Sequence, residues 1–199
     1  LAAISGIEEV TLTTNGVLLA PMAAELKAAG ATRVNVSVDS MNRETYQQMT
    51  GSDALPQAIS GIHKAIEVGL TPVRINSVIV KGFNDSPEQI DALARMSIDL
   101  PVAVRFIEYC PTGPRPALRD GYVPNSEVRR IVEREFGSLS PVAGGYTDGP
   151  ALYFKARGSA GTIGFISGRS SMFCQTCNRL RLTSDGKIKP CLYAAPAYD

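Results

Sequence analysis

The sequence lacks most of the features that would assign it to a class at once. It has no tryptophan, one histidine and an aromatic content of 7%. Its 20 basic and 19 acidic side chains leave a formal charge of +1, which excludes the strongly basic balance typical of nucleic-acid or membrane-surface binding. No apolar run approaches the roughly 18 residues of a membrane helix, and no basic-then-apolar leader opens the chain. We therefore expect a soluble cytoplasmic protein without nucleic-acid or membrane partners.

Cysteine is also scarce, but three of the four cysteines cluster near the C-terminus. Two residues separate Cys174 from Cys177, and an Asp185-Gly186 hairpin turn would fold Cys191 back toward them. Thiolates at this spacing can reach one metal ion or cluster. Two interpretations stay open: an iron–sulfur cluster with three cysteine ligands and one open iron position, which we favour, or a zinc site completed by Cys110. A CxxC redox pair would leave Cys191 without a role.

Two arginines follow these cysteines directly. If Leu180 lies in a strand, Arg179 and Arg181 point to the same side of it, close to the metal. Planar guanidinium groups bind phosphate oxygens in a bidentate manner, so the pair predicts a phosphate or nucleotide site. The alternative is an ordinary solvated basic strand, and adjacency to the cysteines favours the ligand site.

Upstream of residue 110, strand-like and helix-like segments alternate. Strands are expected at 10–14, 33–39, 73–80 and 102–108, and helices at 18–29, 43–49, 56–68 and 86–98. Ser86, Pro87 and Gln89 form a capping box at the start of the last helix. This order is typical of a parallel α/β protein.

One face of these strands is repeatedly polar. In residues 34–39 valine alternates with Asn35, Ser37 and Asp39, and the strands at 10–14 and 73–80 show the same alternation. In an ordinary α/β core such polar groups would have to satisfy one another. In a barrel, the same face would be a binding surface for a polar ligand. Its repetition over several strands favours a barrel with a ligand.

The composition changes in the second half of the chain. Residues 111–124 are rich in proline and glycine and predict a loop or lid. A helix is expected at 125–136, ending at Gly137, followed by short strands at 152–156, 162–166, 180–183 and 187–191. We therefore divide the chain into a partial βα barrel, residues 1–124, and a mostly β extension, residues 125–199, that would hold the metal.

The segment from Cys174 to Cys191, CQTCNRLRLTSDGKIKPC, unites the metal spacing, the arginine pair and the hairpin. It resembles the GTP 3′,8-cyclase (MoaA) family. Upstream, TTNG at 13–16, NVSVD at 35–39, KGFND at 81–85 and RFIEY at 105–109 are similar to that family in order and spacing. The resemblance covers essentially the whole chain.

The resemblance implies a radical S-adenosylmethionine (radical SAM) lyase of molybdenum cofactor biosynthesis. Its fold would be an incomplete TIM-like βα barrel with a [4Fe-4S] cluster at each end of a channel. The implied site residues are Cys174, Cys177 and Cys191 for the C-terminal cluster, whose open iron binds the guanine of GTP, Arg179, Arg181, Thr13 and Arg74 for GTP, and Ser37 and Cys110 for S-adenosylmethionine. Arg74 stands where the family usually has lysine, and Cys110 where it commonly has methionine.

The resemblance also implies parts that this sequence does not contain. The CxxxCxxC triad of the first cluster and a glycine-rich SAM-binding segment would precede Leu1, and the family continues beyond Asp199. We therefore expect a segment truncated at both ends, with no catalytic residue of its own and no activity alone.

In the complete protein the resemblance implies that an electron donor reduces S-adenosylmethionine. The resulting 5′-deoxyadenosyl radical takes the C3′ hydrogen of GTP, and the ribose radical then attacks C8. The sequence sets no oligomeric state, and a homodimer is compatible with it. Two rival functions remain: a different radical SAM enzyme with an auxiliary cluster, and a zinc-stapled binding module without catalysis.

Overall fold

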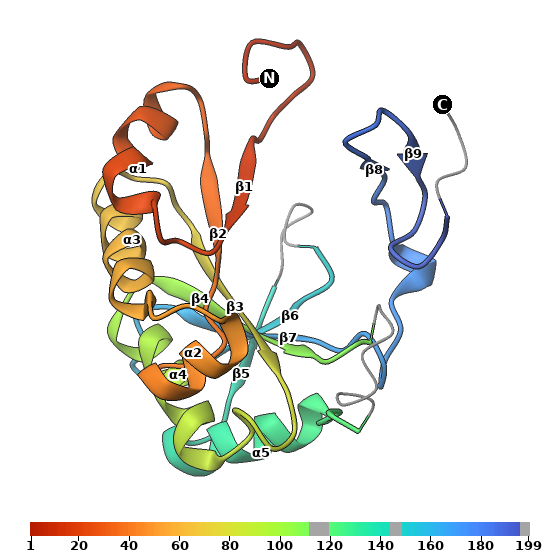
Figure 1. Cartoon of the computed structure of the whole chain (residues 1–199). Coiled ribbons are helices and arrows are strands. Elements are labelled where there is room, and N and C mark those ends of the chain that lie inside the picture. The colour runs from red at the N-terminus through yellow and green to blue at the C-terminus, as the bar shows by residue number, and fades with distance from the viewer. Residues whose placement is uncertain (112–119, 144–148, 196–199) are drawn as a thin grey trace.

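One sheet organises the computed structural model, which describes residues 1–111, 120–143 and 149–195. Its strand order is β1-β2-β3-β4-β7-β6-β5 (Figure 1). Five neighbouring strands are parallel to one another: β1 (Thr11–Thr14), β2 (Arg33–Ser37), β3 (Val73–Ile79), β4 (Val102–Glu108) and β7 (Thr162–Ile166). The antiparallel strands β6 (Leu152–Lys155) and β5 (Ser140–Val142) extend the sheet at the far edge.

Helices pack against one face of this sheet and build the core with it. They are α1 (Leu19–Ala28), α2 (Arg43–Thr50), α3 (Leu55–Glu67), α4 (Pro87–Asp99) and α5 (Asn125–Phe136). One apolar stripe of α3 lies in this core, with Ile62 fully buried and Ile59 and Ile66 packed against it. Val34, Val36 and Val38 are completely buried there too, because side chains alternate between the two faces of a strand.

The predicted α/β class is confirmed, as a mostly parallel sheet typical of a partial TIM-like βα barrel. Ser86 caps α4 as expected, since its side chain accepts a hydrogen bond from the Gln89 N–H. The strands predicted at 152–156 and 162–166 join the main sheet rather than a separate one. The division at residue 124 stays a prediction, and residues 112–119 of the predicted loop or lid lie outside the described residues.

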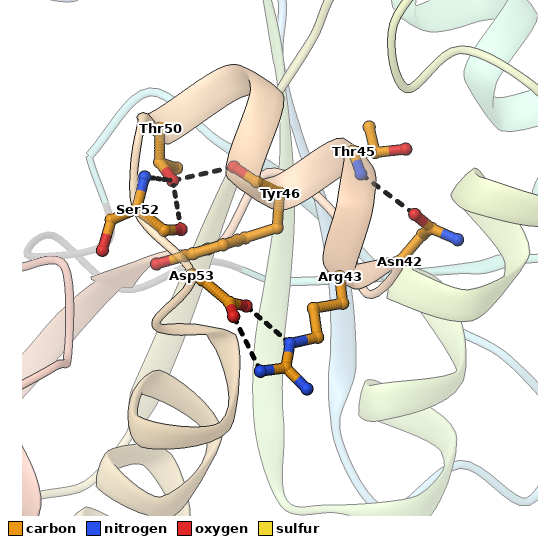
Figure 2. A network of polar contacts seen from close by, with 7 residues as sticks. All are labelled: Asn42, Arg43, Thr45, Tyr46, Thr50, Ser52 and Asp53. Atoms are coloured by element: carbon orange, nitrogen blue, oxygen red, sulfur yellow. Dashed lines mark hydrogen bonds and ion pairs between the residues drawn. The ribbon is translucent and has the colours of Figure 1, made fainter.

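The short helix α2 is held by local polar contacts (Figure 2). The Asn42 side chain caps its first turn by accepting from the Thr45 N–H at 3.0 Å. Arg43 forms a two-pronged ion pair with Asp53, at 2.5 and 2.7 Å, across the turn into α3. Tyr46 is the buried residue of this polar helix. These contacts hold α2 in place after the carboxyl end of β2.

A second, two-stranded sheet lies apart from the first, on the side of the main sheet away from the helices (Figure 1). It pairs β8 (Arg181–Leu182) with β9 (Ile188–Lys189) and follows the 3₁₀ turn Cys174–Thr176. Gly186, at φ +85°, closes the predicted hairpin turn. We call residues 167–195 the arm. No helix in the described part of the chain has the length and apolar character needed to cross a membrane.

Glycine at position 61 allows α3 to pack closely on the loop after β1. A Cβ atom there would lie 2.5 Å from the carbonyl oxygen of Gly16 and 2.9 Å from the Leu19 Cβ. Neither neighbour is the free end of a flexible side chain, so the backbone would have to move.

We predict that Gly61→Ala destabilises the protein by about 1–3 kcal/mol through overpacking, although alanine is ordinarily the better helix former by about 1 kcal/mol. The thermal unfolding midpoint of the full-length protein checks this. The exposed neighbour Ser60 provides the control, because Ser60→Ala should change stability by no more than about 0.5 kcal/mol. A midpoint for Gly61→Ala at or above that of the wild type would contradict the close packing.

Candidate functional site

A ladder of hydrogen bonds crosses the polar face of the sheet. The register pairs Thr13 with Asn35 and Asn76 with Arg105, so these residues share one face. The Arg105 guanidinium donates to Asn76 Oδ1 at 2.8 Å and to Asn35 Oδ1 at 3.1 Å, and Asn35 Nδ2 donates to Thr13 Oγ1 at 3.2 Å. The polar residues therefore satisfy one another in part, as the alternative interpretation of the sequence required.

The same face contains three buried arginines. Arg33, Arg74 and Arg105 are 6%, 3% and 7% exposed, and the register places them on one side of adjacent strands. Arg33 forms an ion pair with Glu9 at 2.8 Å. Burial lowers the pKa of Arg105, and repulsion from Arg74 and Arg33 lowers it further. A concentration of buried positive charge is favourable when an anion lies against it.

Two polar residues at the end of β2 have different surroundings. The carboxylate of Asp39 accepts from the Val78 N–H at 2.8 Å, and burial raises the pKa of this group. Asn84 donates to the Asp39 carbonyl oxygen, so Asp39 mainly joins the chain after β2 to β3 and to the loop that follows β3. Ser37 is half-buried on the inner face opposite Asn76, and within the described residues no hydrogen bond occupies its hydroxyl. Its position is compatible with a ligand contact.

The arm contains the three predicted metal ligands. Cys174, Cys177 and Cys191 are exposed and free. Hydrogen bonds from the backbone N–H and the guanidinium of Arg179 lower the pKa of Cys177, which favours the thiolate that binds metals. In the described ranges, no three His, Cys, Asp or Glu side chains are gathered as a metal-binding group. The donor set fits a thiolate-bound metal, and the cluster itself stays a prediction.

The hairpin of the arm has one cationic and one apolar face. Arg181 pairs with Lys189, and Leu182 pairs with Ile188, so each pair shares a face. Arg181 and Lys189 are partly covered, whereas Leu180 and Leu182 are 73% and 75% exposed. Among the described residues no carboxylate forms an ion pair with Arg179, Arg181 or Lys189, in contrast to Lys187, which pairs with Asp185 at 3.4 Å. Like charges directly opposite each other are unfavourable unless an anion lies between them.

Cys110 lies where the arm meets the barrel. Its Sγ would be 3.1 Å from a Cβ atom at Gly168, in the first residues of the arm. A hydrogen bond with Cys110 raises the pKa of Tyr193 to about 12. Cys110 therefore lies next to residues from both ends of the arm. Its contact with S-adenosylmethionine stays a prediction.

Sequence reasoning did not single out Arg33, Arg105 or Lys189. Arg105 was inside the quoted segment RFIEY, and alternation along its own strand, with the apolar Val104 and Phe106 on the other face, could have indicated its inward direction. The position of Lys189 opposite Arg181 follows from the register of the hairpin. Counting outward from the turn at 184–186 could have predicted this pairing from the sequence.

Comparison with known proteins supports the fold and relates both halves of the chain to known families. Residues 1–95 match the family model "Radical SAM superfamily", and residues 102–199 match "Molybdenum Cofactor Synthesis C". A radical SAM methyltransferase from Sphaerobacter thermophilus has a similar fold, with a TM-score of 0.52 and 22% identity over 62% of this chain and 36% of that one.

Curated relatives extend the match to nearly the whole chain. The GTP 3′,8-cyclase of Moorella thermoacetica is 44% identical over 97% of this chain and 59% of its own length. That of Petrotoga mobilis is 46% identical over 96% of this chain and 58% of its own length. The chain thus spans about 59% of the length of these relatives. With both halves matched, the chain belongs to the GTP 3′,8-cyclase family of the radical SAM superfamily.

Proposed function

We propose that the complete protein containing this chain is a radical SAM GTP 3′,8-cyclase, a lyase that makes the cyclised GTP precursor of the molybdenum cofactor. The main support is the set of cations in the arm: Arg181 pairs with Lys189 on one face of the hairpin, and Arg179 hydrogen-bonds the free thiol of Cys177. Among the described residues none of these cations has a carboxylate partner. Such a face suits a polyanionic nucleotide next to a metal. Relatives of the chain bear the name of this activity.

The inner face of the sheet would hold the other part of the substrate. Thr13 and Arg74 are proposed GTP contacts, and Ser37 and Cys110 are proposed S-adenosylmethionine contacts. Arg105 keeps Asn35 and Asn76 in place through its hydrogen bonds and adds positive charge to the same face. Arginine at position 74 offers a planar, bidentate donor in place of the lysine usual in the family.

The arm would hold the auxiliary [4Fe-4S] cluster through Cys174, Cys177 and Cys191, with one iron open to the guanine. When bound, the other cluster would supply the electron that cleaves S-adenosylmethionine, and the resulting radical would take a hydrogen atom from GTP. The ligands of the second cluster are proposed to lie outside this chain, which contains no CxxxCxxC and would be inactive alone. An external electron donor, a homodimer and a cytoplasmic location also stay predictions.

We predict that replacing both Arg179 and Arg181 with alanine in the full-length protein weakens GTP binding at least about a hundredfold. Each bidentate, charge-assisted contact is worth about 1.5–3 kcal/mol, and both would be lost. Anaerobic equilibrium titration with GTP measures the effect. Unchanged affinity would exclude the proposed role of the pair and favour a radical SAM enzyme with a different substrate.

Lys189 should make a smaller contribution to the same site. We expect Lys189→Gln to weaken GTP binding about twofold to fivefold, because a partly exposed ion pair is worth up to about 1 kcal/mol. The matched control is Lys187→Gln, which removes a lysine already paired with Asp185 and should leave affinity unchanged. Equal effects of the two variants, or a Lys189 effect that does not shrink at high salt, would contradict a direct phosphate contact.

Metal analysis tests the cluster. After anaerobic reconstitution, the triple alanine variant of Cys174, Cys177 and Cys191 should contain about four fewer iron atoms and four fewer sulfides per chain than the wild type, as expected for one [4Fe-4S] cluster. Cys110→Ala should keep them. Loss of one zinc with no loss of sulfide, in Cys110→Ala as well, would instead identify a four-cysteine zinc site.

A further inference from the structure

A buried carboxylate lies at the end of β4, on the helix-facing side of the sheet. Glu108 is 1% exposed, and it points away from the inner face to which Arg105 contributes. Burying a charged carboxylate is costly unless hydrogen bonds replace its water. Within the described residues, no ion pair joins Glu108 to an arginine or lysine. Its partners are therefore uncharged donors.

Five donors from two segments meet at this carboxylate. Its Oε1 accepts from the Asn125 N–H at 3.0 Å, the Ser170 hydroxyl at 2.5 Å and the Tyr122 hydroxyl at 3.4 Å. Its Oε2 accepts from the successive backbone N–H groups of Arg169 and Ser170, both at 2.9 Å. Burial alone would raise the pKa of Glu108, but these hydrogen bonds outweigh it and lower the pKa, so the group is ionised at neutral pH.

The two donor segments are also tied to each other. Asn125 Nδ2 donates to the Ser167 hydroxyl at 3.0 Å. The Arg169 guanidinium lies over the Tyr122 ring, 4.2 Å from its centre. The first residues of α5 and the first residues of the arm are thus fixed to the end of β4 as one unit.

This unit is the base of the arm. Residues 167–170 follow β7 directly, and Cys174 comes four residues after Ser170. Beyond this base the arm has its own two-stranded sheet, and many of its apolar side chains are exposed. The orientation of the base therefore sets where the cysteines and arginines of the arm lie relative to the inner face.

We propose that Glu108 is a positioning residue, which fixes the base of the arm to the end of β4 and so sets the distance between the nucleotide held by the arm and the radical-forming end of the barrel. This role rests on the proposed function. Glu108 touches neither substrate nor cofactor and acts through residues 167–170. A displacement of about 1 Å between reacting groups can lower a rate by about a hundredfold, which makes such a fixed base valuable for a radical that must take one particular hydrogen.

The test uses Glu108→Gln in the full-length, reconstituted protein. Glutamine keeps the shape but places an NH₂ donor against at least one of the N–H groups that the carboxylate accepted. We expect the yield of cyclised product per 5′-deoxyadenosine formed to fall roughly tenfold or more, because the radical still forms but meets a displaced substrate. We expect amide hydrogen exchange in the peptide containing Arg169 and Ser170 to quicken roughly tenfold or more.

Two further variants separate positioning from general stability. Ser170→Ala removes one donor without altering the carboxylate, so it should show the same two changes in a milder form and decides the question if Glu108→Gln does not fold. Ser159→Ala removes a buried hydroxyl that bonds to Ala156 and Gly161 at the opposite end of β7. It should lower stability without altering the product yield per 5′-deoxyadenosine.

The outcomes are distinct. Faster exchange with an unchanged yield would show that Glu108 only stabilises the fold, and unchanged exchange would show that it does not hold the arm; either result overturns the proposal. If the wild type forms no 5′-deoxyadenosine or no cyclised GTP, the proposed function fails instead, and hydrogen exchange alone then decides whether Glu108 fixes the arm.

Discussion

Hydrogen bonds between polar side chains on adjacent parallel strands offset the cost of burying polar groups on the inner face of this sheet. Arg105 reaches Asn76 and Asn35, and Asn35 reaches Thr13, so donors and acceptors that would otherwise be costly to bury are matched across three strand boundaries. This match requires the parallel register, and the register in turn requires helices on the opposite face to bury the alternating valines and isoleucines. The polar face and the apolar core are therefore two results of one constraint.

The molecule buries charge in two different ways. On the inner face, positive charge is concentrated on Arg33, Arg74 and Arg105, with repulsion among them, which suits a site that an anionic ligand completes. On the helix side, hydrogen bonds from protein donors satisfy the negative charge of Glu108. The first arrangement is suited to binding, and the second to holding segments in place.

The arm depends on both arrangements. Its hairpin has a cationic face without acidic partners in the described residues. The apolar side chains on its other face are exposed and not packed in the core. A hairpin with strands of two residues cannot define its own position. Contacts at its base, through Glu108 and Cys110, determine where the thiols and guanidinium groups lie. The metal, in our proposal, would complete the order of the arm itself.

The sequence alone determined the α/β class, most element positions, the cap at Ser86 and the closeness of Cys177 to Arg179, because these depend on spacing within short segments. It could not place β7 beside β4, with β6 and β5 following it, since pairing between distant strands leaves no local signal. Only the tertiary structure brought Arg33 and Arg105 onto one face with Arg74, and only the tertiary structure gave Glu108 its five donors. Those donors come from segments 14 to 62 residues away, where only folding makes them neighbours.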